Sequence, residues 1–306
     1  MKKTKVVVIL GCTASGKTGL GIKLSDLFGG EIISADSRQV FKGMDIGSGK
    51  DLKDYVTAKI PYHLIDVVKP NTKFSLAKYQ RLASVAIEDI WRRGKLPFIV
   101  GGTGLYLQAI VEDYKLSEAK SDLKMRAALE ALSVDELLGK LAHLNSEFAA
   151  RLNNSDRHNK RRLARYVEIF SQELEFVPRK FSDNAKYDFL LLGIDWPMEV
   201  LEDKIRHRII ERLEKEDMIG EIKRLHQEKV SWKRLESFGL EYKYVALYLQ
   251  GKIDYETMIE RLNTATRQFA KRQKTWWKRW EKQGAKINWV NNFLEAKDLV
   301  KGFVKR

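Results

Sequence analysis

The segment from Lys5 to Thr18, KVVVILGCTASGKT, limits the fold of this chain more strongly than any other part of the sequence. Residues 6–10 are apolar and rich in β-branched side chains, which is typical of a buried strand in a parallel sheet. A full match to the pattern G-x-x-x-x-G-K-[ST] follows from Gly11 to Thr18, and a helix-compatible segment comes next. This order of strand, loop and helix predicts a phosphate-binding loop and disfavours a chance glycine-rich turn.

The predicted loop would bind phosphate through its backbone and two side chains. Its glycines let successive N–H groups point at an anion, and the following helix adds the positive end of its dipole. We expect Lys17 to reach phosphate oxygens and the Thr18 hydroxyl to hold Mg²⁺. The predicted phosphate-binding residues are Gly11, Thr13, Ala14, Ser15, Gly16, Lys17 and Thr18. The loop pattern alone does not identify the phosphate compound.

Composition narrows the class of protein. The 306 residues carry a formal net charge of +15, which favours a nucleic-acid partner over a role in solubility alone. Cys12 is the only cysteine, which excludes a disulfide framework. The five histidines form no H-E-x-x-H pair, so we expect no protein-bound zinc. No apolar run has membrane-spanning length, and the one near the N-terminus is too short for a signal peptide, so we expect a cytoplasmic protein without membrane contact.

Alternating strand and helix signals predict an α/β fold. Strand signals recur at residues 31–36, 62–66, 96–100, 187–196 and 287–290, mostly with helical patterns between them. No strand signal occurs between residues 115 and 186, where helical patterns dominate. We therefore predict a parallel-sheet core like that of P-loop NTPases, formed by residues 1–114 and 187–306, with a helical insertion at 115–186. The glycine- and lysine-rich stretch 42–59 shows no period and is expected to be a loop.

Polar residues at predicted strand ends are candidates for catalysis, because ligands of open α/β sheets bind at that edge. Asp36 is a candidate general base or Mg²⁺ orienter, against the simpler role of a helix cap or salt bridge. Asp66 and Asp195 also end apolar runs, and spacing alone does not show which of the three aspartates has this role. Thr103, within GGTG, is flanked by glycines that permit close approach of a ligand, although a plain turn fits equally well.

Two basic segments are candidate RNA contacts. The first is residues 161–165, RRLAR, at the start of a helical pattern. The second combines basic and aromatic side chains, which neutralise phosphates and stack on unpaired bases. Tryptophan on a helix more often packs inward, so part of this second segment is expected to belong to the core. Its residues are Arg267, Lys271, Arg272, Lys274, Trp276, Trp277, Lys278, Arg279 and Trp280.

Five motifs together resemble the tRNA dimethylallyltransferase family, also called tRNA isopentenyltransferase. They are GCTASGKT, ISADSRQVFKGMDIGSGK, HLID, GKLPFIVGGTGLYL and TRQFAKRQKTWW. The resemblance runs from residue 6 to about residue 290. It implies transfer of a dimethylallyl group from dimethylallyl diphosphate to the exocyclic N6 amine of the adenosine 3′ of the anticodon in tRNA, releasing diphosphate. It further implies Mg²⁺ as cofactor, an α/β core with a helical tRNA-binding insertion, and a monomer.

The resemblance also implies roles for individual residues. The general base falls on Asp36, the threonine at the reacting centre on Thr103, and a diphosphate-binding arginine on Arg208, within K-I-x-x-R-I. The chain departs from the family at Cys12, where proline is usual, and at Lys204, where arginine is usual. Implied tRNA contacts are Asp36, Ser37, Arg38, Gln39, Thr103, Arg126, Arg161, Arg162, Leu163, Ala164 and Arg165.

Other functions remain open at the level of sequence. An adenylate isopentenyltransferase would use the same core with a free nucleotide, and the two basic segments argue against it. A P-loop kinase or an ATP-driven RNA-binding protein shares the phosphate loop, as would a non-catalytic RNA-binding module. The sequence leaves open which tRNAs are used, and whether Asp66 or Asp195 helps to hold Mg²⁺.

Overall fold

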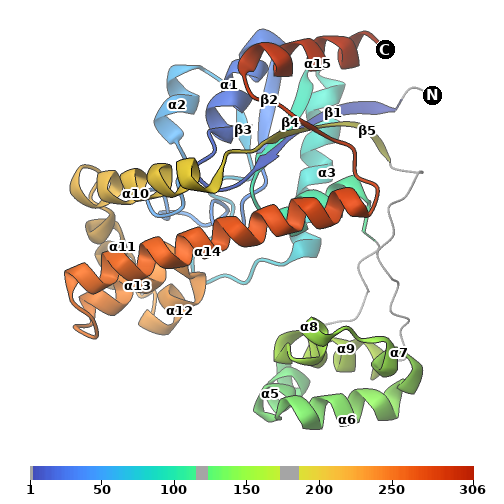
Figure 1. The fold of residues 1–306 in the computed structure, drawn as a ribbon, viewed down its shortest axis with the longest axis vertical. Helices are drawn as coiled ribbons and strands as arrows, with labels where there is room; N and C mark the ends of the chain where they lie inside the picture. The colour runs from blue at the N-terminus through green and yellow to red at the C-terminus, as the bar shows by residue number, and fades with distance from the viewer. Residues whose placement is uncertain (1–2, 115–122, 173–185) are drawn as a thin grey trace. The chain divides into compact units, whose positions relative to one another are not determined.

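A parallel sheet forms the centre of the larger of two units (Figure 1). The computed structural model describes residues 3–114, 123–172 and 186–306. Within them, six strands pair in parallel in the order β3-β2-β4-β1-β5-β6, as the α/β prediction requires. The strands are β1 (Thr4–Gly11), β2 (Gly30–Ser34), β3 (Tyr62–His63), β4 (Leu96–Gly101), β5 (Tyr187–Ile194) and β6 (Ile287–Trp289).

Helices cover both faces of this sheet, because side chains of β1 alternate between two apolar layers. Val6, Val8 and Leu10 belong to one layer, and Val7 and Ile9 to the other. The first layer is completed by α3 (Leu76–Arg92), α4 (Gly104–Val111) and part of α14 (Tyr255–Lys282). The second is completed by α1 (Lys17–Leu27), α2 (Leu52–Thr57) and α15 (Phe293–Lys305).

A third apolar cluster joins the segments after the strands to further helices. It contains Cys12, Phe41 and Met44 from those segments, and Met258 and Leu262 from α14. Since α14 also places Trp277 and Trp280 in the first sheet layer, this long helix connects the two clusters. The other helices of the cluster are α10 (Met198–Glu214), α11 (Met218–Gln227), α12 (Trp232–Phe238) and α13 (Leu240–Leu249).

The second unit, Tyr114–Lys180, is helical and has a core of its own. Leu137, Leu141 and Leu163 are fully buried there. Its helices are α5 (Leu123–Ala131), α6 (Val134–Leu144), α7 (Ser146–Arg151), α8 (Asn154–Arg157) and α9 (Lys160–Phe170). The start of the predicted insertion, residues 115–122, and residues 173–185 near its end lie outside the described residues.

Several local predictions differ from the structure. The stretch 42–59 contains the short helix α2, and β3 has only two residues of the five predicted. Between residues 123 and 144 the predicted helical insertion is divided into α5 and α6, because Ser133 caps α6 with a reciprocal capping box. Helices α12 and α15 were not predicted. No helix within the described ranges has the length and apolarity needed to cross a membrane.

Glu31 is a buried carboxylate of β2 that joins neighbouring elements. Arg93, which follows α3, contacts both carboxylate oxygens, with Nη2 lying 2.8 Å from Oε2. His63 of β3 places Nε2 2.8 Å from the same oxygen. Hydrogen bonds from Arg93, and then from His63, lower the pKa of Glu31 to about 2. The carboxylate therefore stabilises the fold in its charged form.

We expect Glu31→Gln to lower the free energy of unfolding in a pH-dependent way. The folded pKa lies below the ordinary 4.5, so the stabilisation is complete above pH 4.5 and disappears as pH falls toward 2. The difference between wild type and variant should be on the order of 2–3 kcal/mol at pH 7 and shrink toward pH 3. Urea denaturation across this range measures it, with the exposed Glu256→Gln as control. A difference independent of pH would contradict this role.

Candidate active site

Four segments that follow neighbouring strands meet at one edge of the sheet. Because the strands are parallel, their carboxyl ends share this edge, where ligands bind in open α/β folds. The strand order β2-β4-β1-β5 makes the segments neighbours. The phosphate loop follows β1, Asp36 follows β2, Thr103 follows β4, and Asp195 follows β5. The fold thus brings together residues that are far apart in the sequence.

The phosphate loop has a backbone conformation that requires glycine. Gly16 has φ 89° and directly precedes α1, so this helix starts without a side-chain cap. Gly11 has φ 155°, and a Cβ there would lie 2.6 Å from the carbonyl oxygen of Ile194. These two glycines allow the tight turn and the uncapped helix start that favour phosphate binding.

Two cations, Lys17 and Arg208, converge on this loop. Lys17 Nζ donates to the carbonyl oxygen of Cys12, and Arg208 Nη2 donates to Thr13 Oγ1 at 2.6 Å. Arg208 Nε is buried and has no hydrogen-bond partner within the part of the chain that the structure describes. The ion pairs found among the described residues include neither cation. The arrangement suits a bound anion, which would supply the negative partner that both cations lack among the ion pairs of the described residues.

Electrostatics support the same conclusion. Burial, aided by the nearby charge of Arg208, lowers the pKa of Lys17 from 10.5 to about 8. Burial also lowers the pKa of Arg208 to about 10, aided by the charge of Arg212 one turn along α10. Such shifts arise where positive charge is desolvated without enough negative charge nearby. A bound diphosphate would supply that charge.

Asp36 and Thr103 lie beside one another, as their predicted shared role requires. The N–H of Ser37 donates to Thr103 Oγ1 at 3.0 Å, which links the segments after β2 and β4. The N–H of Arg38 donates to Asp36 Oδ1 at 2.8 Å, which orients the carboxylate. The charge of Asp36 also acts on Lys17. The structure thus places a carboxylate and a hydroxyl next to the phosphate loop.

The other candidate strand-end aspartates are engaged in ion pairs. Asp66 Oδ1 lies 2.6 Å from Lys50 Nζ, and Asp195 Oδ1 lies 2.8 Å from Lys274 Nζ. Both therefore have a structural partner that Asp36 lacks among the ion pairs of the described residues. This difference favours Asp36 as the reactive carboxylate.

A hydrogen bond joins the segment Ser37–Gln39 to the loop of residues 44–50. The Gln39 amide accepts from Ser34 Oγ at 2.7 Å and donates to the carbonyl oxygen of Gly49 at 2.7 Å. Arg38 is half-buried and lies over the ring of Phe238 at 5.9 Å, and burial lowers its pKa. Gln39 thus has an internal role in addition to the predicted RNA contact.

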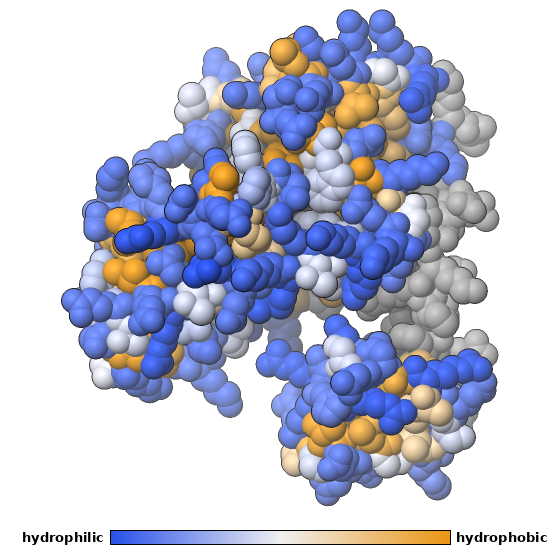
Figure 2. All heavy atoms as spheres, in the orientation of Figure 1, coloured by the Kyte–Doolittle hydropathy of each residue, from blue (hydrophilic) through white to orange (hydrophobic). Residues whose placement is uncertain are grey.

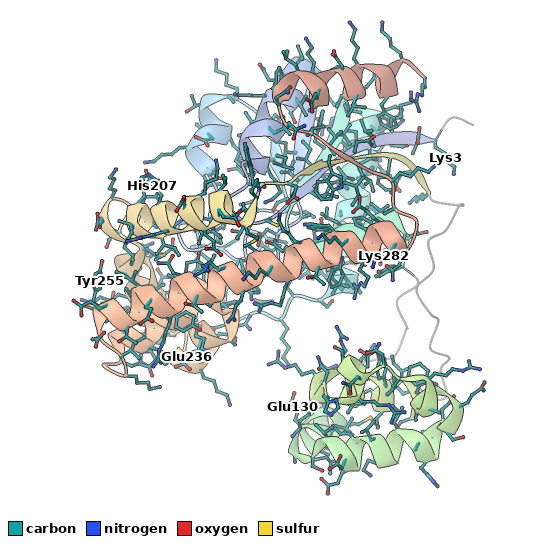
Figure 3. The ribbon with its side chains drawn as sticks, viewed as in Figure 1. Lys3, Glu130, His207, Glu236, Tyr255 and Lys282 are labelled. Atoms are coloured by element: carbon teal, nitrogen blue, oxygen red, sulfur yellow. The ribbon has the colours of Figure 1, made fainter. Side chains whose placement is uncertain are left out.

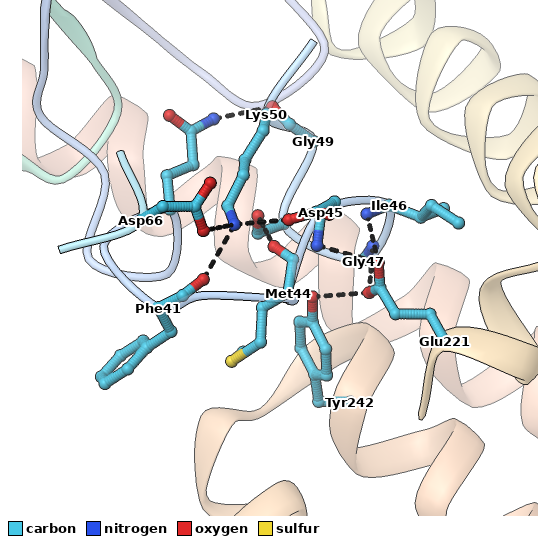
Figure 4. Close-up of polar contacts among 12 residues, drawn as sticks. Phe41, Met44, Asp45, Ile46, Gly47, Gly49, Lys50, Asp66, Glu221 and Tyr242 are labelled. Atoms are coloured by element: carbon cyan, nitrogen blue, oxygen red, sulfur yellow. Dashed lines mark hydrogen bonds and ion pairs between the residues drawn. The ribbon is translucent and has the colours of Figure 1, made fainter. Parts of the chain in front are cut away.

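Glu221 and Lys50, which the sequence analysis missed, fix that loop (Figure 4). The buried Glu221 carboxylate accepts from the N–H groups of residues 45, 46 and 47 at 2.7–3.1 Å, and from Tyr242 Oη at 2.9 Å. Lys50 is buried and donates to Asp66, to Asp45 and to the carbonyl oxygen of Phe41. The stretch predicted to be an unstructured loop is therefore tightly hydrogen-bonded.

Gln273 of α14 is a further residue that the sequence analysis missed. Its Oε1 accepts from the N–H of Thr13 at 2.8 Å, and its Nε2 donates to the carbonyl oxygen of Gly102 at 2.8 Å. A sequence signal existed, since a glutamine interrupts the buried stripe of Thr266, Ala270 and Trp277. The amide joins the phosphate loop to the turn that carries Thr103.

The glycines of GGTG serve packing against α14. A Cβ at Gly102 would lie 2.5 Å from Gln273 Nε2, and one at Gly104 would lie 2.5 Å from Trp276 Cδ1. The sequence analysis expected these glycines to permit close approach of a ligand. At both positions, side chains of α14 occupy the space that a Cβ would need. Thr103 between them keeps its predicted place beside Asp36.

The aromatic half of the second basic segment belongs to the core. Trp277 and Trp280 are fully buried in the first sheet layer, so they are not available to stack on bases. Arg279 lies over the ring of Trp276 at 4.3 Å. The outer side of α14 is hydrophilic (Figure 2), and its side chains extend outward between Tyr255 and Lys282 (Figure 3). Only the basic side chains of this segment fit the predicted RNA contact.

In the second unit, a buried carboxylate organises two of the predicted RNA-contact arginines. Arg126 forms two hydrogen bonds with Glu168, both of 2.9 Å, and Arg165 Nη1 lies 3.0 Å from Glu168 Oε2. Arg161 and Arg162 of the same helix are exposed. Glu168 therefore holds Arg126 and Arg165 in place, and Arg162, although exposed, forms an ion pair with Asp156.

Two predicted RNA contacts in the second unit have buried side chains. Leu163 is fully buried and Ala164 is 8% exposed, and both lie in the core of that unit. Their side chains therefore pack against other helices, in contrast to the RNA contact expected of this stretch. The helical period explains the difference, because α9 turns these two positions inward.

Comparisons with known proteins show the family of this chain. A family model described as IPP transferase matches residues 39–280, and one described as isopentenyl transferase matches residues 4–72. A Citrifermentans bemidjiense protein named tRNA dimethylallyltransferase 2 is 44% identical over 286 residues, covering 93% of this chain and 90% of its own. A Treponema denticola protein of the same name is 44% identical over 292 residues, covering 94% and 96%.

Solved structures show the same fold. A tRNA isopentenylpyrophosphate transferase from Bacillus halodurans has a TM-score of 0.71 and 33% identity, with 99% of this chain and 96% of that chain covered. A eukaryotic dimethylallyltransferase, described as acting on tRNA, has a TM-score of 0.83 and 29% identity, with 99% and 80% covered. The predicted P-loop NTPase-like fold is confirmed.

We expect Arg208→Met to weaken binding of inorganic diphosphate by about tenfold to a hundredfold. The substitution removes a charge-assisted contact, worth roughly 1.5–3 kcal/mol, from a half-buried position. Isothermal titration calorimetry measures the dissociation constant. Arg206→Met, an exposed position on the same helix, is the matched control and should bind like the wild type. Equal binding by both variants would show that Arg208 does not contact the anion.

Proposed function

The chain belongs to the IPP transferase family, and on this premise we propose that it is a tRNA dimethylallyltransferase. It would transfer the dimethylallyl group from dimethylallyl diphosphate to the exocyclic N6 amine of the adenosine 3′ of the anticodon. The observation that carries the proposal is the placement of two half-buried cations, Lys17 and Arg208, near Asp36 and Thr103. A diphosphate bound to these cations would lie next to a proton acceptor, as group transfer to an amine requires.

In the proposed reaction, the bond between the allylic carbon and the diphosphate oxygen breaks as the adenosine nitrogen forms a new bond to that carbon. Lys17, Arg208 and the loop N–H groups stabilise the negative charge that develops on the leaving diphosphate. Asp36 accepts the proton that the amine loses, and Thr103 orients the reacting groups. The adenosine must leave its stack to reach these residues.

A divalent cation fits the proposed site through the donor's phosphates. No group of three or more His, Cys, Asp or Glu side chains suited to a metal occurs within the described ranges. Mg²⁺ is commonly held by few protein ligands together with substrate phosphates and water. The Thr18 hydroxyl, next to Lys17 at the start of α1, would be its protein ligand. Mg²⁺ would neutralise phosphate charge in the bound donor.

We propose that the second unit binds tRNA through its basic side chains. Arg161 and Arg162 are exposed, and Glu168 holds Arg126 and Arg165 with part of each guanidinium in solvent. A tRNA substrate and a single cysteine both fit a cytoplasmic protein, and we propose that the chain acts as a monomer. These basic side chains favour tRNA over a free nucleotide as acceptor, which sets the proposal apart from an adenylate isopentenyltransferase.

The direct test is transfer of label from dimethylallyl diphosphate to unmodified tRNA or to AMP. We expect label in tRNA and none in AMP, since the basic surface serves a polyanion.

Asp36→Asn should abolish transfer while tRNA binding persists, because it removes the proton acceptor at nearly constant shape. Asp26→Asn, at an exposed position of α1, is the control. Near-normal single-turnover transfer by Asp36→Asn would exclude this residue as the base.

Replacing Arg161, Arg162 and Arg165 together by Ala should weaken tRNA binding and reduce its salt dependence. Each lost phosphate contact lowers the slope of log affinity against log salt by about one. Filter binding at several salt concentrations measures this slope. The control replaces three exposed cations at the C-terminal end of α15 and directly after it, Lys301, Lys305 and Arg306, and so changes net charge equally. An unchanged slope in the first variant would place the RNA contacts elsewhere.

A further inference from the structure

Gln273 lies between the two halves of the proposed reaction centre. The N–H of Thr13 belongs to the loop that would hold the leaving diphosphate, and the carbonyl oxygen of Gly102 directly precedes Thr103. Both hydrogen bonds to the Gln273 amide are 2.8 Å long. With 6% of its surface exposed, this side chain makes both contacts away from bulk water.

The partners of Gln273 determine the orientation of its amide. A backbone N–H only donates, so the atom facing Thr13 must be the oxygen. A carbonyl oxygen only accepts, so the atom facing Gly102 must be the nitrogen. No other side chain of this length offers one acceptor and one donor at these places. Glutamate lacks the donor, and methionine, of similar length, lacks both.

The contacts on either side extend this link to the reacting groups. Thr13 Oγ1 accepts from Arg208 at 2.6 Å, and Thr103 Oγ1 accepts from the N–H that follows Asp36 at 3.0 Å. Gln273 therefore connects the diphosphate-binding arginine on one side with the proposed base on the other.

We propose that Gln273 is a positioning residue that sets the distance between the diphosphate-binding loop and the turn carrying Thr103. It acts through Thr13 and Gly102 and touches neither substrate. The inference rests on the proposed function, because it assigns dimethylallyl diphosphate to one side of the Gln273 amide and the adenosine to the other. Group transfer is sensitive to such spacing, and a misplacement of about 1 Å costs about a hundredfold in rate.

The test compares Gln273→Met with Gln227→Met, the same change at an exposed glutamine. Single-turnover transfer is measured with both dimethylallyl diphosphate and tRNA saturating, alongside tRNA affinity and the thermal midpoint. We expect Gln273→Met to lower the saturated rate about tenfold to a hundredfold, with tRNA affinity within about twofold of wild type. A residue that only stabilised the fold would lower the midpoint and leave the saturated rate unchanged below it.

A second variant disturbs the same hydrogen bonds by a change at Gly102 and leaves Gln273 itself unchanged. Gly102→Ala would put a Cβ 2.5 Å from Gln273 Nε2 and so displace the amide. It should lower the saturated rate in the same way, whereas Gly302→Ala, where a Cβ meets no atom within 4 Å, should not. The inference is overturned if folded variants at residues 273 and 102 both transfer within twofold of wild type. Absence of transfer by the unmodified chain would instead overturn the proposed function, and this inference with it.

Discussion

Desolvated positive charge at the phosphate loop is the constraint on which the rest of the site depends. Lys17 and Arg208 are half-buried there, burial lowers their pKa values, and Arg208 Nε has no hydrogen-bond partner among the described residues. Holding two cations in this way costs free energy that the surrounding structure must offset. Hydrogen bonds from Lys17 to Cys12 and from Arg208 to Thr13 keep both groups directed at the loop. A diphosphate would then bind without rearrangement of charge, which is how a preorganised site stabilises a leaving group.

Helix α14 provides much of the support for this arrangement. Its first part packs in the cluster that includes α10, the helix of Arg208, and its later part packs on the sheet. Between these parts, Ala270 accepts from Cys12 Sγ, Gln273 joins the loop to the turn after β4, and Lys274 pairs with Asp195. A single helix thus fixes segments after three strands, so small changes in its position would alter the site as a whole.

Sequence patterns predicted the parts of this structure that depend on local chemistry. The glycine pattern of the phosphate loop and the apolar run before it predicted β1, the loop and α1, because such features are determined within a few residues. The resemblance indicated Asp36, Thr103 and Arg208, which the fold brings to one edge. The pattern did not reveal Gln273, Glu221 or Lys50, since their partners are far away in the sequence. The sequence predicted that some tryptophans of α14 pack inward but not which ones, and the structure shows that Trp277 and Trp280 are buried.

The central claim is that the phosphate loop holds the diphosphate of an allylic donor and not a nucleotide that is hydrolysed. Its most direct test is the stoichiometry of the reaction without ATP, in which released inorganic diphosphate is counted against dimethylallyl groups attached to tRNA. The account predicts one diphosphate for each modified adenosine, and no turnover when ATP or GTP is added. Transfer that required ATP, or hydrolysis of ATP in step with tRNA modification, would contradict the assignment of Gly11 to Thr18 as the donor site.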